Sequence, residues 1–107
     1  MIFRKWTGRI RTADSAAYVA YIEATGAAHY AQTPGNLGYQ ILTRAEPGGI
    51  STVTTLSWWT DLDAVRRFAG DDYEQARYYP EDDEFLVERT QLVEHHVVHI
   101  SRMTSAT

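Results

Sequence analysis

The sequence predicts one α+β domain with the element order βαββαβ. Segments rich in β-branched and aromatic residues alternate with segments whose apolar residues recur at steps of three and four. Clusters of Gly, Pro, Asn and Asp separate these segments, as expected of turns. No internal repeat or linker divides the chain, so residues 1–107 are expected to form a single domain.

The first half of the chain predicts a strand, a helix and a second strand. Ile2 to Arg11 alternates large and polar residues, and Thr12 to Ser15 then offers several helix N-cap residues. Gly26 is expected to weaken the helix in its middle, and Pro34-Gly35-Asn36 ends it. Leu37 to Arg44 predicts the second strand. The apolar stripe of the helix consists of Ala17, Tyr18, Tyr21, Ile22 and Ala28.

The third strand is predicted over Ser51 to Trp59, and Glu46-Pro-Gly-Gly joins it to the second strand as an antiparallel hairpin. A second helix follows, which Thr60, Asp61 and Asp63 begin and Gly70 ends. The apolar face of this helix consists of Leu62, Val65, Phe68 and Ala69.

The last third predicts a short helical turn, a loop and a final strand. Asp71-Asp72 begins the turn, which runs through Tyr73, Ala76 and Arg77 and ends at Pro80. Phe85 and Leu86 are expected to pack a loop against the body of the domain. Val93 to Ile100 predicts the last strand.

Together these elements predict a ferredoxin-like fold, an antiparallel sheet with helices on one face. The strands carry apolar residues at both odd and even positions, and therefore on both faces of the sheet, for example Ile41 beside Leu42 and Val97 beside Val98. A sheet face without helices is normally polar. The second face is therefore expected to pack against another copy of the chain in a homodimer.

The composition excludes several classes of protein. The sequence contains no cysteine, which excludes disulfides, thiolate nucleophiles and cysteine-ligated metals. The formal net charge of −4 disfavours a nucleic-acid partner. No segment is long and apolar enough to span a membrane, and no secretory signal precedes the first strand, so a cytoplasmic location is expected.

Several short motifs resemble one known family. They are Trp6-x-Gly8-Arg9, Thr33-Pro34-Gly35-Asn36-x-Gly38, Ser57-x-Trp59, Phe68-Ala-Gly-Asp-Asp, Ala76–Asp83 (ARYYPEDD) and Val93-Glu94-His95. As a set they resemble the antibiotic-biosynthesis-monooxygenase-like branch of the dimeric α/β barrels. The resemblance implies two ferredoxin-like protomers packed sheet to sheet. It also implies a reaction drawn from cofactor-free oxygenation of aromatics, haem degradation, or polyketide cyclisation and isomerisation.

One feature of the haem-degrading relatives is absent. Those proteins commonly carry a histidine nine or ten residues beyond the tryptophan that matches Trp59. The corresponding positions here are Phe68 and Ala69. The resemblance therefore does not extend to a haem ligand at that site, and no cofactor or metal is expected.

The last strand contains the candidate general base. His95 and His99 are expected to share one face of the strand, with His96 on the other. A cofactor-free oxygenase needs a base that deprotonates a phenol or anthrone, and we assign this role to His95. Two alternatives remain open: ordinary strand or interface histidines, and a zinc site formed by His95 and His99.

An aromatic wall between the sheet and the helices is the candidate substrate-binding surface, because a flat apolar molecule could stack there. The alternative is that the same side chains form the core. The residues of this wall are Trp6, Tyr39, Ser57, Trp59 and Phe68.

The segment ARYYPEDD offers groups that could bind an anion. Arg77 could pair with Asp82, Asp83 or a carboxylate of the substrate, and Tyr79, like Tyr78, could donate to an oxyanion. The alternative is a turn clamped by ion pairs. Arg9 is a second candidate for an anionic ligand, with a solvated edge or pairing with Glu94 as its alternative.

These observations favour a cofactor-independent monooxygenase-like enzyme acting on a small aromatic or polyketide-type substrate. In this hypothesis His95 is the base, and Tyr79 or Arg77 stabilises the anion. Two alternatives stay open: a polyketide cyclase, dehydratase or isomerase without redox chemistry, and a dimer that binds small molecules without turnover.

Overall fold

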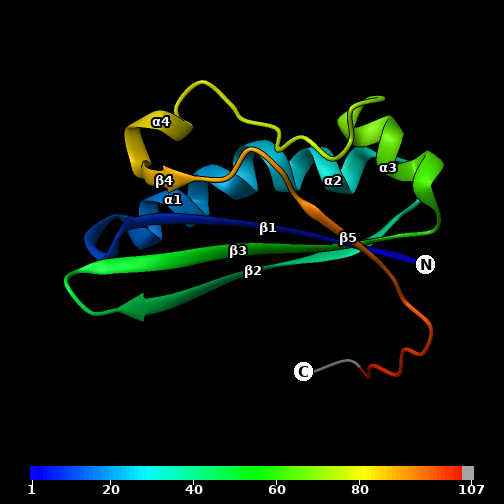
Figure 1. Ribbon diagram of the computed structural model, residues 1–107, viewed down its shortest axis with the longest axis horizontal. Coiled ribbons are helices and arrows are strands. Elements are labelled where there is room, and N and C mark those ends of the chain that lie inside the picture. Colours follow the sequence, from blue (N-terminus) through cyan, green and yellow to red (C-terminus); the bar gives the residue numbers. More distant parts are fainter. Residues whose placement is uncertain (105–107) are drawn as a thin grey trace.

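An antiparallel sheet carries the helices on one of its faces, as Figure 1 shows. The computed structural model describes residues 1–104 of the chain. Two short helical segments, Thr12–Asp14 (3₁₀) and Glu23–Ala27 (π), flank α1. The other elements in chain order are β1 (Ile2–Arg11), α1 (Ser15–Ile22), α2 (Ala28–Gln32), β2 (Asn36–Glu46), β3 (Ile50–Trp59), α3 (Leu62–Ala69), α4 (Asp82–Phe85), β4 (Leu86–Arg89) and β5 (Glu94–Val97).

The strand order of the sheet is β2-β3-β1-β4. β5 also pairs with β1, along a different part of that strand from β4. β4 lies opposite Gly8 to Ile10, whereas β5 lies opposite Ile2 to Lys5. The two short strands therefore act as one interrupted fourth strand along a single edge of β1. The predicted ferredoxin-like fold is confirmed.

The predicted final strand, Val93 to Ile100, is wrong in its bounds. Only Glu94–Val97 pairs with β1, and Leu86–Arg89, whose first residue was expected in a loop, forms β4. The chain between the two strands turns away from β1, where Leu92 forms an isolated bridge with Gln75 and Val93 is buried. Alternation of apolar residues predicts extended backbone but not where the partner strand is available.

The helical turn predicted after Asp71-Asp72 is wrong in its extent. A turn spans residues 71–74, closed by the Gln75 amide donating to the Asp72 carbonyl at 2.9 Å, residues 76–79 are irregular, and the short helix α4 follows Pro80. Acidic residues at positions 82–84 fill the first turn of α4, where the helix dipole favours negative charge. The Asp82 carboxylate also accepts a hydrogen bond from the Tyr79 amide at 2.6 Å.

The expected weak point of the first helix is a π-helical turn. The segment Glu23–Ala27 joins α1 to α2 without interrupting the helical path, and Gly26 lies within it. The Thr25 hydroxyl donates to the Tyr21 carbonyl at 2.7 Å. Widened turns of this kind often occur beside functional sites.

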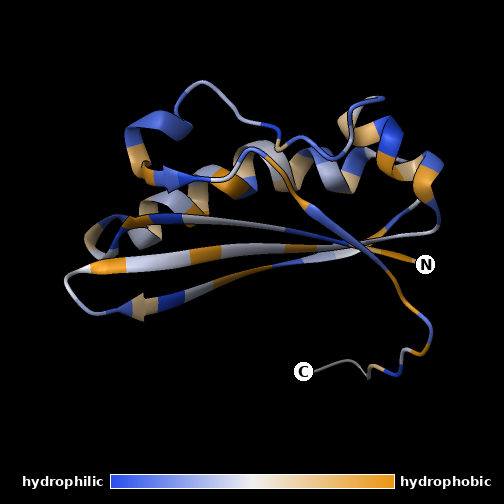
Figure 2. Cartoon of the chain, viewed as in Figure 1, coloured by the Kyte–Doolittle hydropathy of each residue, from blue (hydrophilic) through white to orange (hydrophobic). Residues whose placement is uncertain are grey.

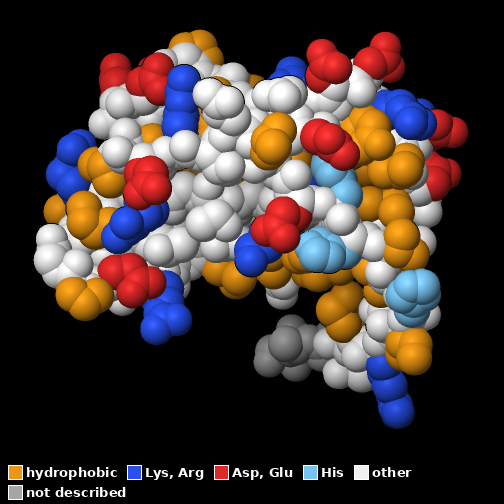
Figure 3. Space-filling view, in the orientation of Figure 1, with side chains coloured by type: hydrophobic (Ala, Val, Ile, Leu, Met, Phe, Trp, Pro, Cys, Tyr) orange, Lys and Arg blue, Asp and Glu red, His pale blue; other side chains and the backbone are white. Residues whose placement is uncertain are grey.

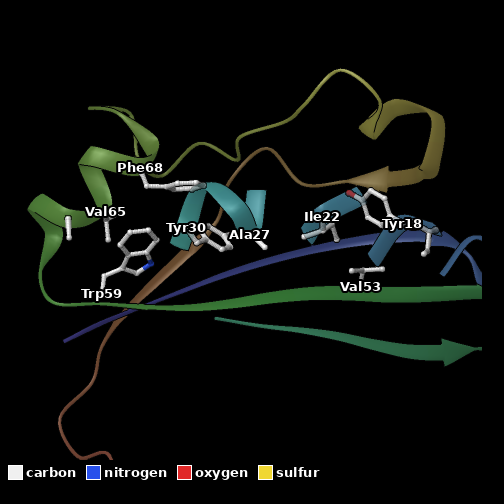
Figure 4. Close-up of a cluster of buried hydrophobic side chains, with 10 residues drawn as sticks. Tyr18, Ile22, Ala27, Tyr30, Val53, Trp59, Val65 and Phe68 are labelled. Carbon is white, nitrogen blue, oxygen red and sulfur yellow. The ribbon is translucent and has the colours of Figure 1, made fainter. Parts of the chain in front are cut away.

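Alternate residues of β3 face the helices and are buried, from Ser51 to Trp59. Figure 4 shows Val53 and Trp59 on the side of β3 that faces the helical layer, where Ile22 lies over Val53 and Tyr30 and Phe68 lie beside Trp59. The hairpin between β2 and β3 and the Asp61 cap of α3 are as predicted, and Asp61 accepts from the Ala64 amide at 2.9 Å. Within residues 1–104, no helix is both long and apolar enough to cross a membrane.

Replacement of Gly35, in the turn before β2, is expected to destabilise the fold. Its φ is +93°, and an added Cβ would lie 2.5 Å from the Cβ of Ala64 in α3. We expect Gly35→Ala to lower the free energy of unfolding by about 2–4 kcal/mol, because backbone strain and overpacking combine. Gly48→Ala is the control: its φ is +84° without an atom within 4 Å, so only strain of about 1 kcal/mol applies. Equal losses in urea denaturation would contradict this contact.

Candidate active site

A cavity of about 50 Å³ lies between the helical layer and the sheet. Its walls come from segments far apart in the sequence: β1, the helix from α1 to α2, α3, and the loop before α4. Figure 4 shows four of the wall residues, Tyr18, Ile22, Tyr30 and Phe68, in the layer between the helices and the sheet. The wall residues are Arg4, Trp6, Tyr18, Ile22, Thr25, Gly26, Tyr30, Thr55, Phe68, Arg77, Tyr78, Tyr79, Asp82 and Val93.

Arg4 is a buried cation in the wall of the cavity. Only 3% of its surface is exposed, and its Nη1 donates to the Tyr73 carbonyl at 2.6 Å and to Nε2 of His95 at 2.9 Å. Its guanidinium carbon lies 5.5 Å from the centroid of the Phe68 ring. Burial lowers the pKa of Arg4 from its ordinary value, and the nearby Tyr30 hydroxyl partly offsets this effect. Sequence reasoning missed this residue as a site residue, although it shares the inward face of β1 with Trp6.

His95 lies behind Arg4 and not in the wall of the cavity. β5 places it opposite Arg4 in the sheet, and its ring packs edge-on against Tyr73, 5.3 Å between centroids. A guanidinium only donates, so Nε2 of His95 is an acceptor and the neutral ring carries its proton on Nδ1. Burial, with the Arg4 charge as the next contribution, lowers the pKa of His95 to about 4. The Nε2 lone pair of His95 is therefore occupied by the hydrogen bond from Arg4.

Arg77 is the second guanidinium in the wall. Its Nη1 donates to the Phe68 carbonyl at 2.5 Å, and its guanidinium carbon lies 5.5 Å from the ring centroids of both Phe68 and Tyr79. The ion pairs expected with Asp82 and Asp83 do not form. Asp83 pairs with Arg89, and Asp82 accepts from the Tyr18 hydroxyl at 2.8 Å.

The two neighbouring tyrosines of the wall differ in how their hydroxyls are used. The Tyr78 hydroxyl donates to the Thr90 carbonyl and accepts from the indole of Trp6 at 3.1 Å. The Tyr79 hydroxyl lies 3.2 Å from Nδ1 of His29. Burial raises the pKa of both phenols above the ordinary value, so both are neutral at physiological pH. Tyr79 is thus the one better placed to exchange a proton.

His29, in α2, is a residue that sequence reasoning did not select. Besides Tyr79, it contacts the Phe68 ring edge-on at 4.9 Å. Burial, followed by the positive charge of Arg77, lowers the pKa of His29, which keeps the ring neutral and able to accept a proton. Its spacing of one helical turn from Thr25 and Gly26, which line the cavity, is the sequence signal that points to it.

Of the remaining predicted site residues, Trp6 and Phe68 line the cavity and the others do not. Trp59 is fully buried in the core and donates to the Ser57 hydroxyl at 2.9 Å. The Tyr39 ring packs at the β2 edge, 5.9 Å from that of Tyr30. Arg9 is on the face of β1 opposite Arg4. It pairs with Glu88 at 3.3 Å, not with Glu94, because the β4 register sets Glu88 beside it.

The side chains that could hold a metal or a haem iron lie apart from one another. Within the described residues 1–104, no three His, Asp or Glu side chains converge as metal ligands would. His99 lies beyond β5, so the shared strand face predicted for His95 and His99 does not form. At position 68, where the resemblance to haem-degrading proteins led us to look for a histidine, the Phe68 ring lines the cavity and packs in the core.

Solved structures share this fold along nearly the whole chain. A proposed antibiotic biosynthesis monooxygenase from Bacillus cereus is 12% identical, with a TM-score of 0.66 and coverage of 99% of this chain and 98% of that chain. A monooxygenase from Streptomyces coelicolor, in complex with nanaomycin D, is 16% identical, with a TM-score of 0.58 and coverage of 97% and 92%. SnoaB, a cofactor-independent oxygenase from Streptomyces nogalater, is 19% identical, with a TM-score of 0.54 and coverage of 94% and 93%.

No protein-family model matches the sequence, and no curated protein is significantly similar to it. At the identities of the solved structures, the similarity establishes the fold alone. The resemblance to antibiotic-biosynthesis-monooxygenase-like proteins, predicted from the sequence motifs, is confirmed at that level.

The lowered pKa of His95 predicts a dependence of stability on pH. Between pH 6.5, its ordinary pKa, and about 4, the unfolded chain binds a proton that the folded chain does not. The free energy of unfolding is therefore expected to decrease as the pH is lowered from 6.5 to about 4. In His95→Gln this part of the loss should disappear, whereas His99→Gln, an exposed histidine beyond β5, should retain it. Parallel losses in all three proteins, measured by urea denaturation from pH 7 to 4, would contradict the assignment.

Proposed function

We propose that this protein is a cofactor-independent monooxygenase-like enzyme that acts on a small aromatic or polyketide-type substrate in the cavity between the helices and the sheet. One observation carries the proposal: two guanidiniums and the neutral Tyr79 phenol line a cavity with aromatic walls, and His29 contacts the Tyr79 hydroxyl from behind that wall. This combination suits a reaction in which a phenol loses its proton and becomes an anion. Solved structures of the same fold that are described as monooxygenases support it.

The proposed reaction begins with removal of a proton from the substrate. The substrate hydroxyl gives its proton to the Tyr79 oxygen while the Tyr79 proton passes to Nδ1 of His29, 3.2 Å away. Arg4 and Arg77 stabilise the resulting anion, because charge is strongly stabilised where water is excluded. His95 orients Arg4 through its Nε2 and is a positioning residue in this scheme.

The anion then reduces dioxygen directly. Electrons pass from the substrate to O₂ and a carbon–oxygen bond forms, which gives a peroxide anion on carbon. The proton held by His29 returns through Tyr79 to the outer peroxide oxygen and gives a hydroperoxide. Loss of water from this hydroperoxide leaves a carbonyl group. In balance, a CH₂ group and O₂ give C=O and H₂O.

The cavity must widen before a ring can enter. Its volume of about 50 Å³ is far below the 300–1,000 Å³ of typical ligand sites. The loop from Arg77 to Pro80 belongs to no helix or strand and faces the π-helical turn across the cavity, where a Cβ on Gly26 would lie 3.7 Å from the Tyr79 ring. We expect the backbone of this loop to move outward when substrate binds, while the Tyr79 hydroxyl stays within hydrogen-bond reach of His29.

Oxygen uptake with 1,8-dihydroxyanthrone tests the reaction. Tyr79→Phe is expected to lower kcat by about a hundredfold or more, since it breaks the proton path to His29. Tyr21→Phe is the control, because it removes a hydroxyl that accepts from the Glu81 amide outside the cavity wall. Uptake that is unchanged in Tyr79→Phe would contradict the proton path, and absence of uptake in the unmodified protein would contradict the oxygenase.

A non-redox function is the main alternative. A proton acceptor beside cations that stabilise an enolate also serves cyclisation, dehydration or isomerisation of a polyketide. Product formed without oxygen uptake would select this alternative. Thermal stabilisation by ligands without any product would instead select a binding protein.

We expect the enzyme to be a homodimer. The face of the sheet without helices carries Phe3 and Trp58, with ring centroids 5.5 Å apart, and Leu42, which is 46% exposed. Figure 2 shows hydrophobic residues on β2 and on the segment after β5, and Figure 3 shows hydrophobic side chains along the lower edge of the molecule. A second copy packed on this face would bury them.

Light scattering at micromolar concentration is expected to give twice the chain mass of 12.2 kDa. Leu42→Lys should shift the mass toward the monomer, because it inserts a charge into the apolar face. Leu92→Lys, at an exposed leucine outside the strands, should not. A monomeric mass for the unmodified protein would contradict the homodimer.

A further inference from the structure

We propose that the cavity recognises a ligand that already carries a carboxylate, which Arg4 and Arg77 bind together. The aromatic part of the ligand then lies along Trp6 and Phe68. This inference rests on the cavity being the substrate site proposed above, and it restricts the substrate class to aromatic or polyketide-type acids.

The first reason is that the buried charge of Arg4 has no counter-ion in the protein. Among the described residues 1–104, no Asp or Glu forms an ion pair with Arg4, although only 3% of its surface is exposed. Its neighbours are a carbonyl, a neutral histidine, the Phe68 ring and the Tyr30 hydroxyl, and none of them is a carboxylate. A buried cation without a counter-ion is costly, and an anionic ligand would relieve that cost.

The second reason is the way in which the guanidinium nitrogens are used. Both hydrogen bonds of Arg4 leave from Nη1, and its Nε and Nη2 make none within the described part of the chain. Arg4 lines the cavity, so Nε and Nη2 are the nitrogens left to bind a ligand there. The edge formed by these two nitrogens matches the two oxygens of a carboxylate.

Arg77 repeats this pattern from the other wall. Its hydrogen bond to the Phe68 carbonyl also uses Nη1, and it forms no ion pair among residues 1–104. Asp82, the one carboxylate in the described wall, accepts from the Tyr18 hydroxyl and the Tyr79 amide and forms no ion pair with either arginine. Both guanidinium carbons lie 5.5 Å from the centroid of the Phe68 ring, which places the two charges around one side chain.

The size of the cavity agrees with an acid group. A volume of about 50 Å³ corresponds to a few water positions at about 10–15 Å³ each, which is room for a carboxylate but not for a ring. The carboxylate can therefore bind between the arginines first, and the ring requires the loop movement proposed above. Trp6, fixed by its bond to Tyr78, supplies a rigid apolar surface for that ring.

Binding of 2-naphthoate, compared with the neutral 2-naphthalenemethanol, tests the proposal by isothermal titration calorimetry. We expect 2-naphthoate to bind about tenfold more tightly or better, as charge-assisted hydrogen bonds allow. Arg77→Met should remove most of this difference. Arg44→Met is the matched control, since it removes a cation whose side chain is 83% exposed on the hairpin. Arg4→Met should also remove the preference, but Arg77→Met decides the test if Arg4→Met does not fold.

Equal affinities for the two compounds, no binding of either, or an unchanged preference in Arg77→Met would overturn the carboxylate site. Oxygen uptake with 1,8-dihydroxyanthrone, which carries no carboxylate, is measured on the same preparations. Uptake without a carboxylate preference would overturn this inference and leave the oxygenase standing. A carboxylate preference without uptake would support the inference and count against the oxygenase.

Discussion

The buried guanidinium of Arg4 is the constraint on which the site depends. β1 directs this side chain under the helices, where only 3% of its surface is exposed, and three parts of the chain are arranged to hold it. The Tyr73 carbonyl comes from the turn after α3, His95 from β5, and the Phe68 ring from α3 itself. A charge in this position must be hydrogen bonded or neutralised, so these distant segments are held together.

The burial of Arg4 also explains why the other site residues interact in different ways. His95 stays neutral because burial and Arg4 both oppose a second positive charge, and it serves Arg4 as an acceptor. Tyr78 is committed to Thr90 and Trp6, which fixes the loop against β1. In the proposed reaction, the pair that moves the proton is Tyr79, in the cavity wall, and His29 behind it. The proposed anion-binding groups, Arg4 and Arg77, are different residues.

Sequence reasoning predicts the parts of this molecule that depend on local rules. Alternation along β1 places Arg4 and Trp6 on one face, and Asp61 marks the start of α3. Sequence reasoning fails where the role of a residue depends on contacts with residues far away in the sequence. Local patterns do not encode the register between strands. The pairing of β1 with β5 places His95 beside Arg4, and the pairing of β1 with β4 places Glu88 beside Arg9. Asp82 likewise meets Tyr18 and not Arg77, because the bend at Pro80 turns it inward.

The central claim is that Arg4 and Arg77 form one anion-binding site inside the cavity. A crystal structure of the protein with 6-bromo-2-naphthoate, in which anomalous scattering locates the bromine, tests it most directly. The claim predicts the carboxylate between the two guanidiniums, with the ring along Trp6 and Phe68 and the loop of Tyr79 displaced outward. A ligand located outside the cavity, or inside it with its carboxylate directed away from both arginines, would contradict the claim.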